Sequence, residues 1–467
     1  MQYFIIPVVF GFLSALLRKK SVDYALLLIN GTINLIYTIC ILFVNQASTK
    51  YLAVDPLNKP FLLVLSIVFF SASVYSVGFL KKSNTDNLWH SVYTACFILF
   101  DTLMMLSLMA QHIGLYWVLL EATTILTAPL IYFSKTKHSL EAAWKYVFIC
   151  SIGIAIGFLG IIFLSITFKN TESLFFADFY NYTGNVSLLF LKIAFLFILV
   201  GFGTKMGLAP LHFWLPDAHS EAPSPVSAML SATLLNTALV GIIRVLKVMY
   251  IFNGEHFANT MLMVMGLLSI FVSTVFILRI KNYKRMLAYS SVENMGIIAL
   301  SLGSGGLGLL ASMIHVLGHS MMKSSLFLSA GNILEKYKTK HYDETGNVIN
   351  DMKITGFIFL VSVLGLLGMP SSLSFLSEFI LVKNFLERKM YMELAILTVL
   401  LTALFYGLMK MVITMLFSGK TTEREKENLS SWLPQVVLII ICFALGFIMP
   451  APIKEMLMNA ASWIGGK

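Results

Sequence analysis

Charged residues are scarce in this sequence. They make up 12% of the 467 residues, whereas hydrophobic residues make up 58%. A water-soluble domain carries roughly 25% charged residues, because polar groups must cover its surface. This composition therefore excludes an ordinary soluble globule and indicates a chain whose outer surface faces lipid.

Cysteine is also rare, and its four occurrences lie far apart in apolar stretches, at Cys40, Cys96, Cys150 and Cys442. Zinc and iron–sulfur sites need closely spaced thiolates such as CxxC, and the sequence has no such spacing and no HExxH motif. We therefore expect no metal site and no cofactor in this chain, and interpret the cysteines as small apolar helix residues.

Strand-like alternation of apolar and polar residues is missing, which excludes a membrane β-barrel. The first apolar run lacks a basic start and an A-x-A-like cleavage site, so we interpret it as a helix rather than a signal peptide. What is present is a series of long, nearly uncharged runs, each near the length of about 20 residues that spans a bilayer.

These runs predict an all-α, polytopic membrane protein with about fourteen transmembrane helices. The predicted spans are 2–17, 24–44, 61–80, 91–110, 113–133, 143–167, 188–206, 224–246, 258–279, 286–303, 306–330, 355–380, 391–418 and 433–449.

The net charge of +10 could suggest binding to nucleic acid. Basic residues, however, gather in alternate loops such as 18–20 and 279–285. The positive-inside rule assigns such loops to the cytoplasm, which places both termini outside. We therefore attribute the positive charge to membrane topology and expect no nucleic-acid partner.

Several ionisable residues fall inside the predicted spans, where a charge costs at least ~2.5–3.5 kcal/mol and often marks an ion pathway. They are Glu121, Lys205, His315, His319, Lys323 and Glu378. The two histidines and Lys323 are spaced i, i+4, i+8, so they share one helix face and suit a proton relay. Structural hydrogen bonding, or a metal-binding histidine pair, remains open.

Glu121 and Lys205 carry opposite charges on separate predicted helices. A carboxylate that moves relative to a buried lysine changes the proton affinity of that lysine. The pair could therefore load and eject a proton. The alternative is a static ion pair that holds the two helices together.

Proline and glycine interrupt two predicted spans beside a charge, first after Lys205 at GLAPLHFWLPDAHSEAPSP and again before Glu378 at Gly368 and Pro370. Paired broken helices indicate inverted repeats and a transport route. We predict an N-terminal three-helix segment (1–90), a first five-helix repeat for proton input (91–250), a second for proton output (258–418), and a C-terminal helix and tail (433–467).

The stretch KMGLAPLHFWLPDAHSEAPSPVSAMLSA from Lys205 resembles the signature of the proton-translocating antiporter-like subunits of respiratory complex I, Mrp-type antiporters and membrane-bound hydrogenases. KRMLAYSSVENMG at 284–296 and HVLGHSMMKSSLFLSAGNIL at 315–334 are similar to two further motifs of that family. WVLLEATTILTAPLIYF and SLEAAWKYVFICSIGIAIGFLG are most similar to component F of hydrogenase-4 and related group 4 hydrogenase or formate hydrogenlyase complexes.

The resemblance implies roles along one proton pathway. Glu121 would modulate the central lysine, Lys205, and the pathway would end at Glu378. The residues assigned to the pathway are Glu121, Lys205, Asn236, His315, His319, Lys323 and Glu378, and the possible accessory residues are His212, His219, Glu141, Lys145, Glu293 and Arg244. Asn236 replaces a Lys or His of many relatives, and Asn294 replaces a frequent His, so the central part of the pathway is expected to depend more on water.

The resemblance further implies a multi-pass protein of a prokaryotic cytoplasmic membrane that moves H⁺ and works with other membrane subunits. It also implies soluble redox partners of hydrogenase or NADH-dehydrogenase type, which would hold the nickel–iron and iron–sulfur centres. The alternatives are a subunit of an Mrp-type Na⁺/H⁺ antiporter, a membrane subunit for inorganic-carbon uptake, and a non-conducting scaffold. The density of intramembrane charge argues against the scaffold.

Overall fold

The protein is helical throughout the part that the computed structural model describes, residues 2–43, 49–83, 85–168, 173–419 and 424–466. Outside the helices, backbone pairing in these ranges is limited to isolated bridges such as Leu52 with Ala110. The helices are α1 (Ile5–Leu17), α2 (Lys20–Phe43), α3 (Asn58–Lys82), α4 (Asn87–Met109), α5 (Ile113–Ile131), α6 (Lys137–Thr167), α7 (Phe176–Tyr180), α8 (Leu188–Met206), α9 (Trp214–Glu221), α10 (Ser224–Met229), α11 (Leu235–Ile251), α12 (Glu255–Ile277), α13 (Tyr283–Ser304), α14 (Leu307–Tyr337), α15 (Val348–Asp351), α16 (Lys353–Leu366), α17 (Leu373–Glu387), α18 (Tyr391–Phe417), α19 (Leu429–Phe447) and α20 (Ala451–Gly465), with short helical turns at Gln2–Phe4, Tyr132–Ser134 and Leu230–Leu234.

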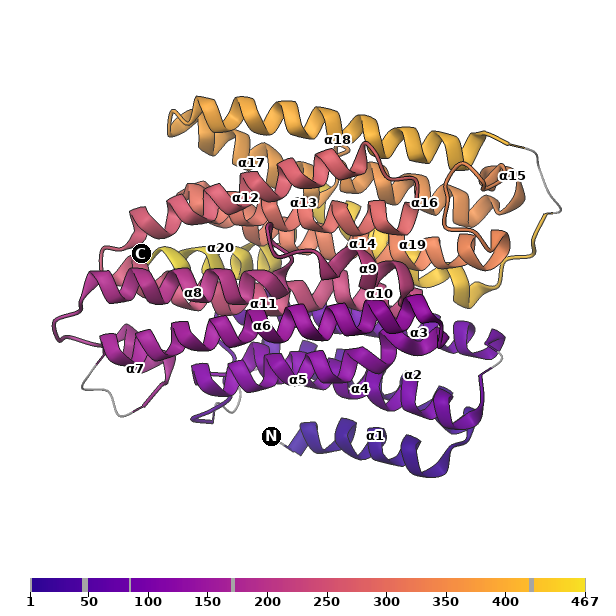
Figure 1. Ribbon diagram of the computed structural model, residues 1–467, viewed down its shortest axis with the longest axis horizontal. Helices are drawn as coiled ribbons and strands as arrows, with labels where there is room; N and C mark the ends of the chain where they lie inside the picture. Colours follow the sequence, from indigo (N-terminus) through magenta and orange to yellow (C-terminus); the bar gives the residue numbers. More distant parts are fainter. Residues whose placement is uncertain (1, 44–48, 84, 169–172, 420–423, 467) are drawn as a thin grey trace.

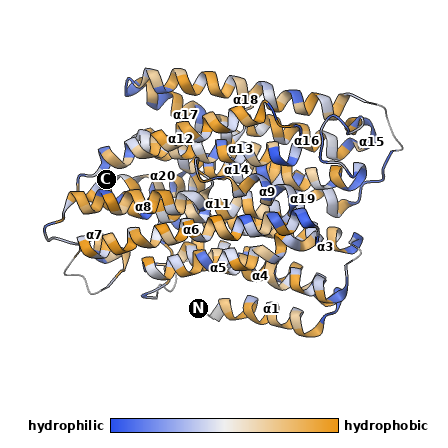
Figure 2. Cartoon of the chain, viewed as in Figure 1, coloured by the Kyte–Doolittle hydropathy of each residue, from blue (hydrophilic) through white to orange (hydrophobic). Residues whose placement is uncertain are grey.

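The long helices lie side by side with nearly parallel axes, from α1 at one edge to α18 at the other (Figure 1). Apolar residues cover most of their length, whereas hydrophilic residues gather toward helix ends and loops (Figure 2). Within the described ranges, ten helices are long and apolar enough to cross a membrane. The predicted all-α, polytopic membrane architecture is confirmed.

The remaining predicted spans are also helical. Each is too short, divided or too polar to count among these ten helices. Helix α1 has only 13 residues. The span predicted at 355–380 is divided between α16 and α17. Helices α13 and α14 hold many buried serine, asparagine, histidine and lysine residues, so they are the least hydrophobic of the long helices. Their polarity is the first sign that a site lies in the interior.

The two predicted helix breaks are present. Helix α8 ends at Met206, and Gly207 adopts a left-handed conformation with φ of 84°, which favours glycine because it has no Cβ. The second break follows α16, where Gly368 has φ of 76°. Ser372 then starts α17 by accepting a hydrogen bond from the backbone N–H of Phe375 at 3.1 Å.

Helices α6 and α8 approach closely because small residues face each other. Gly153 packs against Thr204, and Gly157 packs against Gly201 and Phe202. Small residues at four-residue spacing allow membrane helices to bring their backbones together. This contact fixes the end of α8, and therefore the position of Lys205, relative to α6.

A methyl group at position 201 tests this packing. The Cβ of Gly201→Ala would overlap the backbone of Gly157, whereas the Cβ of Gly203→Ala would meet nothing closer than Leu208 Cδ1 at 3.6 Å. We expect Gly201→Ala to lower the free energy of unfolding by about 1–3 kcal/mol through overpacking. Thermal unfolding in detergent should show a lower midpoint for this variant alone. Equal midpoints for both variants would contradict the close contact of α6 and α8.

Candidate functional site

Lys205 lies in the last turn of α8 and is fully buried. Its Nζ donates hydrogen bonds to the carbonyl oxygen of Leu120 at 2.6 Å and to Thr124 Oγ1 at 2.5 Å, both on α5. The carboxyl end of a helix also favours a positive charge, because the unpaired carbonyls and the helix dipole point toward it. The first break therefore places a cation where the backbone can stabilise it.

Glu121 lies next to this contact, one residue after the carbonyl that Lys205 uses. Ser151 Oγ donates a hydrogen bond to Glu121 Oε1 at 2.5 Å, and Oε2 is buried with no protein partner. Among the described residues, no ion pair joins Glu121 to Lys205 within 4.0 Å. The static ion pair considered from the sequence is therefore absent, and the Glu121 carboxylate has an unused acceptor.

A π-helical turn at Leu230–Leu234 precedes Asn236 at the start of α11. Such turns disturb the regular backbone ladder and occur often at functional sites. The carbonyl of Ala232 accepts hydrogen bonds from Asn236 Nδ2 at 2.6 Å and from Ser320 Oγ at 2.8 Å. The carbonyl of Ser231 is 3.3 Å from His319 Nε2. The turn thus supplies acceptors to side chains of α14.

Helix α14 holds three fully buried ionisable residues, His315, His319 and Lys323, whose partners lie on α13, on α17 and in the π-helical turn. His319 meets the π-helical turn, and its Nδ1 has no protein partner. Lys323 Nζ donates to the carbonyl oxygen of Leu287 at 2.8 Å and to Ser290 Oγ, both on α13. The shared face predicted from their spacing is therefore a buried polar seam.

His315 joins α13 to α17 through Asn294 and Ser377. His315 Nε2 is 3.0 Å from Asn294 Oδ1, and Nδ1 is 2.8 Å from Ser377 Oγ. Asn294 Nδ2 donates to Glu293 Oε2 at 2.6 Å and to the carbonyl of Ser290 at 2.7 Å. These two donor contacts orient the Asn294 amide so that its oxygen faces His315.

Glu378 lies beside the second break. Its carboxylate is so close to Gly368 that a Cβ there would be 2.7 Å from Oε2. Glu378, Glu293 and Thr402 line a cavity of about 280 Å³ that is bounded by α13, α17, α18 and the end of α16. The structure thus brings Glu293, which the sequence suggested only as an accessory residue, next to the predicted end of the pathway.

The other accessory residues fall into two groups. Glu141 and Lys145 form an exposed pair at 2.6 Å, and Arg244 forms a buried pair with Asp55 at 2.7 Å, so these three belong to other ionic contacts. His212 and His219 are buried, and neither ring nitrogen of either residue has a protein partner.

The sequence did not identify the hydroxyl groups that complete the site. They belong to Thr124, Ser151, Ser290, Ser320 and Ser377. The available signal was weak: each is a small polar residue near an ionisable residue in the folded chain, but only Ser320 and Ser377 adjoin one in sequence.

Comparisons with known proteins agree with this architecture. Residues 110–405 match the family described as NADH:quinone oxidoreductase/Mrp antiporter, transmembrane. The hydrogenase-4 component F homolog of Methylacidiphilum infernorum is 30% identical over 96% of this chain and 97% of that protein. A chain of the membrane-bound sulfane sulfur reductase, an archaeal respiratory complex, has a TM-score of 0.89 at 22% identity, over 99% of this chain and 97% of its own. A chain of the Mrp complex from a Dietzia species has a TM-score of 0.88 at 17% identity, over 99% and 96%. The two structures show a shared fold.

The amide of Asn294 offers a test of the α13–α14 contact. Asn294→Leu leaves Glu293 Oε2 and His315 Nε2 without the hydrogen-bond partner that each has in the wild-type protein. An unsatisfied buried group costs about 1–3 kcal/mol. We expect a matching loss of thermal stability in detergent. Asn30→Leu is the control, because Asn30 is fully buried with no hydrogen bond from its side chain. A loss no larger for Asn294→Leu than for Asn30→Leu would exclude the Glu293–Asn294–His315 linkage.

Proposed function

The chain belongs to the NADH:quinone oxidoreductase/Mrp antiporter transmembrane family, and from this premise we propose that it is the proton-translocating membrane subunit of a redox-driven, complex I-like assembly. The proposed assembly is of the group 4 hydrogenase or formate hydrogenlyase type. The observation that carries this proposal is a row of ionisable groups that leads from the buried Lys205 of α8, through the buried residues of α14, to the half-buried Glu378 of α17, supported by hydroxyls and carbonyls. Such groups inside a membrane commonly form proton relays.

The first step concerns Glu121 and Lys205. Glu121 has one free oxygen, so a charge change in a neighbouring subunit can move the carboxylate relative to the ammonium group. A nearer carboxylate favours the charged lysine, and a more distant one favours release of its proton. The mobile element is thus a side chain with an unfilled hydrogen-bonding position rather than a locked ion pair.

From Lys205 the proposed route passes through water to the polar seam of α14. Asn236 Oδ1 and His319 Nδ1 are buried without protein partners, and buried polar atoms of this kind are normally satisfied by internal water. Asn236 cannot carry a proton, but its amide can orient the water that does. The replacement of a basic residue by Asn236 is therefore compatible with a water-based central segment.

His315 is suited to pass a proton onward. The oxygen of Asn294 is an acceptor, so His315 Nε2 carries hydrogen and donates to it. On the other side, the Ser377 hydroxyl can rotate, because it also reaches the carbonyl of Ser374 at 2.7 Å. Ser377 can therefore donate to a neutral imidazole or accept from a charged one. Both protonation states of His315 keep their hydrogen bonds.

The route ends at the cavity shared by Glu293 and Glu378, from which the proton leaves toward the outside. The residues of the route are organised in the two five-helix repeats, 91–250 and 258–418, and both chain termini lie outside the prokaryotic cytoplasmic membrane. The redox chemistry takes place in partner subunits with nickel–iron and iron–sulfur centres. Other membrane subunits complete the assembly.

A subunit of an Mrp-type Na⁺/H⁺ antiporter is the second candidate, and the similarity to the Mrp complex chain favours it. Sodium prefers oxygen ligands, which the Glu293–Glu378 cavity and the nearby helix break offer. The two lysines of the route cannot serve as sodium ligands, because an ammonium group has no acceptor. A membrane subunit for inorganic-carbon uptake is the third candidate, and it would have a soluble zinc-bearing partner.

Replacement of Lys205 tests the pathway. In the purified assembly, Lys205→Ala should reduce proton translocation per electron by about 10²-fold or more, because a positioned proton-transfer group contributes about 10²–10⁴-fold. Lys192→Ala is the matched control, since Lys192 lies on the same helix near its other end. Proton uptake by reconstituted vesicles would be measured together with substrate oxidation. Wild-type stoichiometry in Lys205→Ala would remove this residue from the pathway.

The nature of the assembly is tested by what co-purifies with the chain in mild detergent, identified by mass spectrometry. We expect nickel–iron hydrogenase and iron–sulfur subunits, because the chain aligns with the hydrogenase-4 component F homolog along nearly its whole length. NADH-dehydrogenase subunits would instead assign it to complex I itself. Recovery of small membrane subunits alone would favour the antiporter and rule out redox drive.

A further inference from the structure

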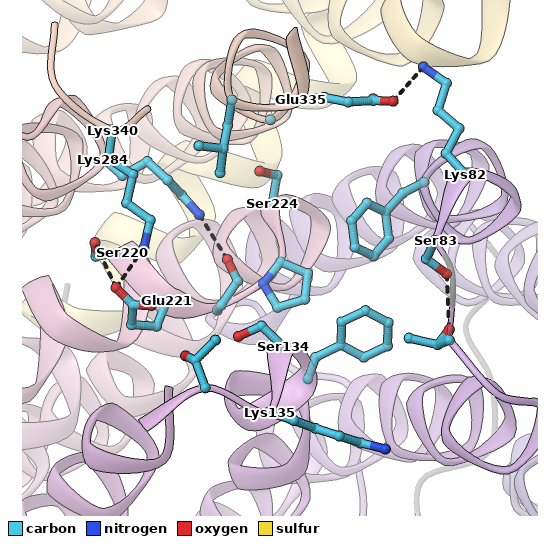
Figure 3. A pocket seen from close by; sticks show the side chains of 18 of the residues that line it. Lys82, Ser83, Ser134, Lys135, Ser220, Glu221, Ser224, Lys284, Glu335 and Lys340 are labelled. Carbon is cyan, nitrogen blue, oxygen red and sulfur yellow. Dashed lines mark hydrogen bonds and ion pairs between the residues drawn. The ribbon is translucent and has the colours of Figure 1, made fainter. Parts of the chain in front are cut away.

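A cavity of about 830 Å³ lies apart from the row of ionisable residues described above. It is bounded by the ends of α3 and α14, the connections between α5 and α6 and between α9 and α10, and the start of α13. Its side chains converge from these separate segments (Figure 3). We call it the vestibule, and six residues define it: Lys82, Lys135, Glu221, Ser224, Lys284 and Glu335. The positive-inside rule assigns this side of the protein to the cytoplasm.

The rim of the vestibule carries charged side chains that water can reach. Lys82 pairs with Glu335 at 2.9 Å, and both side chains are substantially exposed. Lys340 pairs with Glu221 at 2.6 Å. Charges of both signs therefore alternate around the opening, and Figure 3 shows these pairs on opposite sides of the space. These partly exposed charged pairs give water access to the opening of the cavity.

The inner end of the vestibule is Lys284. Although it borders this cavity, Lys284 is 99% buried, and its only described hydrogen bond is from Nζ to the carbonyl oxygen of Ala222 at 2.8 Å. Ala222 is the C-cap residue that follows α9, so the helix does not continue to satisfy its carbonyl. An ammonium group has three donors. Lys284 therefore retains hydrogen-bonding capacity for water on the vestibule side.

A buried histidine lies behind Lys284. His219, in α9, is fully buried, and neither of its ring nitrogens has a protein partner. Its ring stacks on Phe327 of α14 at 4.8 Å between centroids, and Phe327 lies one turn after Lys323. Two unsatisfied nitrogens on one buried ring are costly unless water reaches them. The imidazole therefore marks a hydrated space between the vestibule and α14.

Helix α13 sets the separation between the two lysines. Lys323 reaches the carbonyl of Leu287, and Lys284 lies one turn earlier on the same helix. One turn of helix rises about 5.4 Å. Lys284 reaches the carbonyl of Ala222, three residues after His219, and the His219 ring stacks on Phe327, four residues after Lys323. A short path thus connects the vestibule with the polar seam.

We infer that the vestibule is an aqueous inlet through which protons reach Lys323 by way of Lys284 and His219, at the junction of the two repeats. This inference rests on the proposed function. In the transfer, an N–H bond of the Lys284 ammonium breaks as a proton moves, directly or through water, to a ring nitrogen of His219. The neutral amine then takes its next proton from vestibule water. While charged, Lys284 repels a second proton, so it also limits leakage.

Chemical labelling tests whether the vestibule is open to water. Ser224→Cys would be made in a background without Cys40, Cys96, Cys150 and Cys442, within the full assembly. We expect a membrane-impermeant, cationic thiol reagent to modify it from the cytoplasmic side only and to block proton translocation. Ser73→Cys is the control, because Ser73 on α3 is fully buried and should not react. Absence of Ser224→Cys modification from the cytoplasmic side would overturn the inlet.

Lys284→Met tests the transfer step in the same vesicles. We expect proton translocation per electron to fall about ten-fold or more, as for the loss of a positioned proton-transfer group, whereas Lys383→Met, an exposed lysine on α17, should have no effect. If the wild-type assembly translocates no protons, the proposed function itself fails. If Lys205→Ala abolishes translocation but Lys284→Met and labelled Ser224→Cys retain it, only the inlet is wrong. If Lys284→Met fails to assemble, the labelling result decides.

Discussion

Two ammonium groups without a carboxylate partner set the demands that the rest of this structure meets. Lys205 and Lys323 are fully buried, and neither forms an ion pair among the described residues. Each is held instead by one backbone carbonyl and one hydroxyl from the adjacent helix, Leu120 with Thr124 on α5 and Leu287 with Ser290 on α13. Neutral acceptors stabilise the charged ammonium group but still allow it to release its proton. A tight buried ion pair would hold it far more firmly.

The backbone irregularities follow from the same demand. A carbonyl inside a regular helix already accepts one intrahelical hydrogen bond and has one lone pair left for a side chain, as Leu120 and Leu287 show. Helix ends and disturbed turns add further acceptors at membrane depth. The end of α8, the end of α9 and the π-helical turn before α11 each provide such carbonyls near an ionisable residue. Close packing of α6 and α8 through glycine keeps the end of α8 inside protein rather than lipid.

Sequence reasoning identified the features that depend on local pattern. Hydropathy located the helices, proline and glycine located both breaks, and helical spacing placed His315, His319 and Lys323 on one face. It did not identify the features that depend on register between distant helices. These features are the linkage of Glu293, Asn294 and His315 and the lack of an ion pair between Glu121 and Lys205. They depend on the relative positions of α5, α8, α13 and α14 along their axes.

The π-helical turn was also beyond the sequence, because LSATL has no residue that requires it. The contacts of Asn294 could not be predicted from the sequence either. As a departure from the family pattern it suggested a pathway that depends more on water, yet in the folded chain its amide contacts both Glu293 and His315. The effect of a substitution on a buried network depends on the partners that surround it, and these are visible only in three dimensions.

The residues at the two ends of the proposed route differ in charge when they are protonated and when they are deprotonated. Lys205 is charged when it has a proton, whereas Glu378 is charged when it lacks one. Transfer of a proton from a charged Lys205 to an ionised Glu378 therefore turns two charges inside the helix bundle into two neutral groups, which a medium of low dielectric favours. The step that costs free energy is the return of both charges, when Lys205 takes up a new proton and Glu378 releases its proton. A movement of Glu121 toward Lys205 offsets part of that cost, so the input of energy is most effective at the end of the route where the carboxylate has a free oxygen.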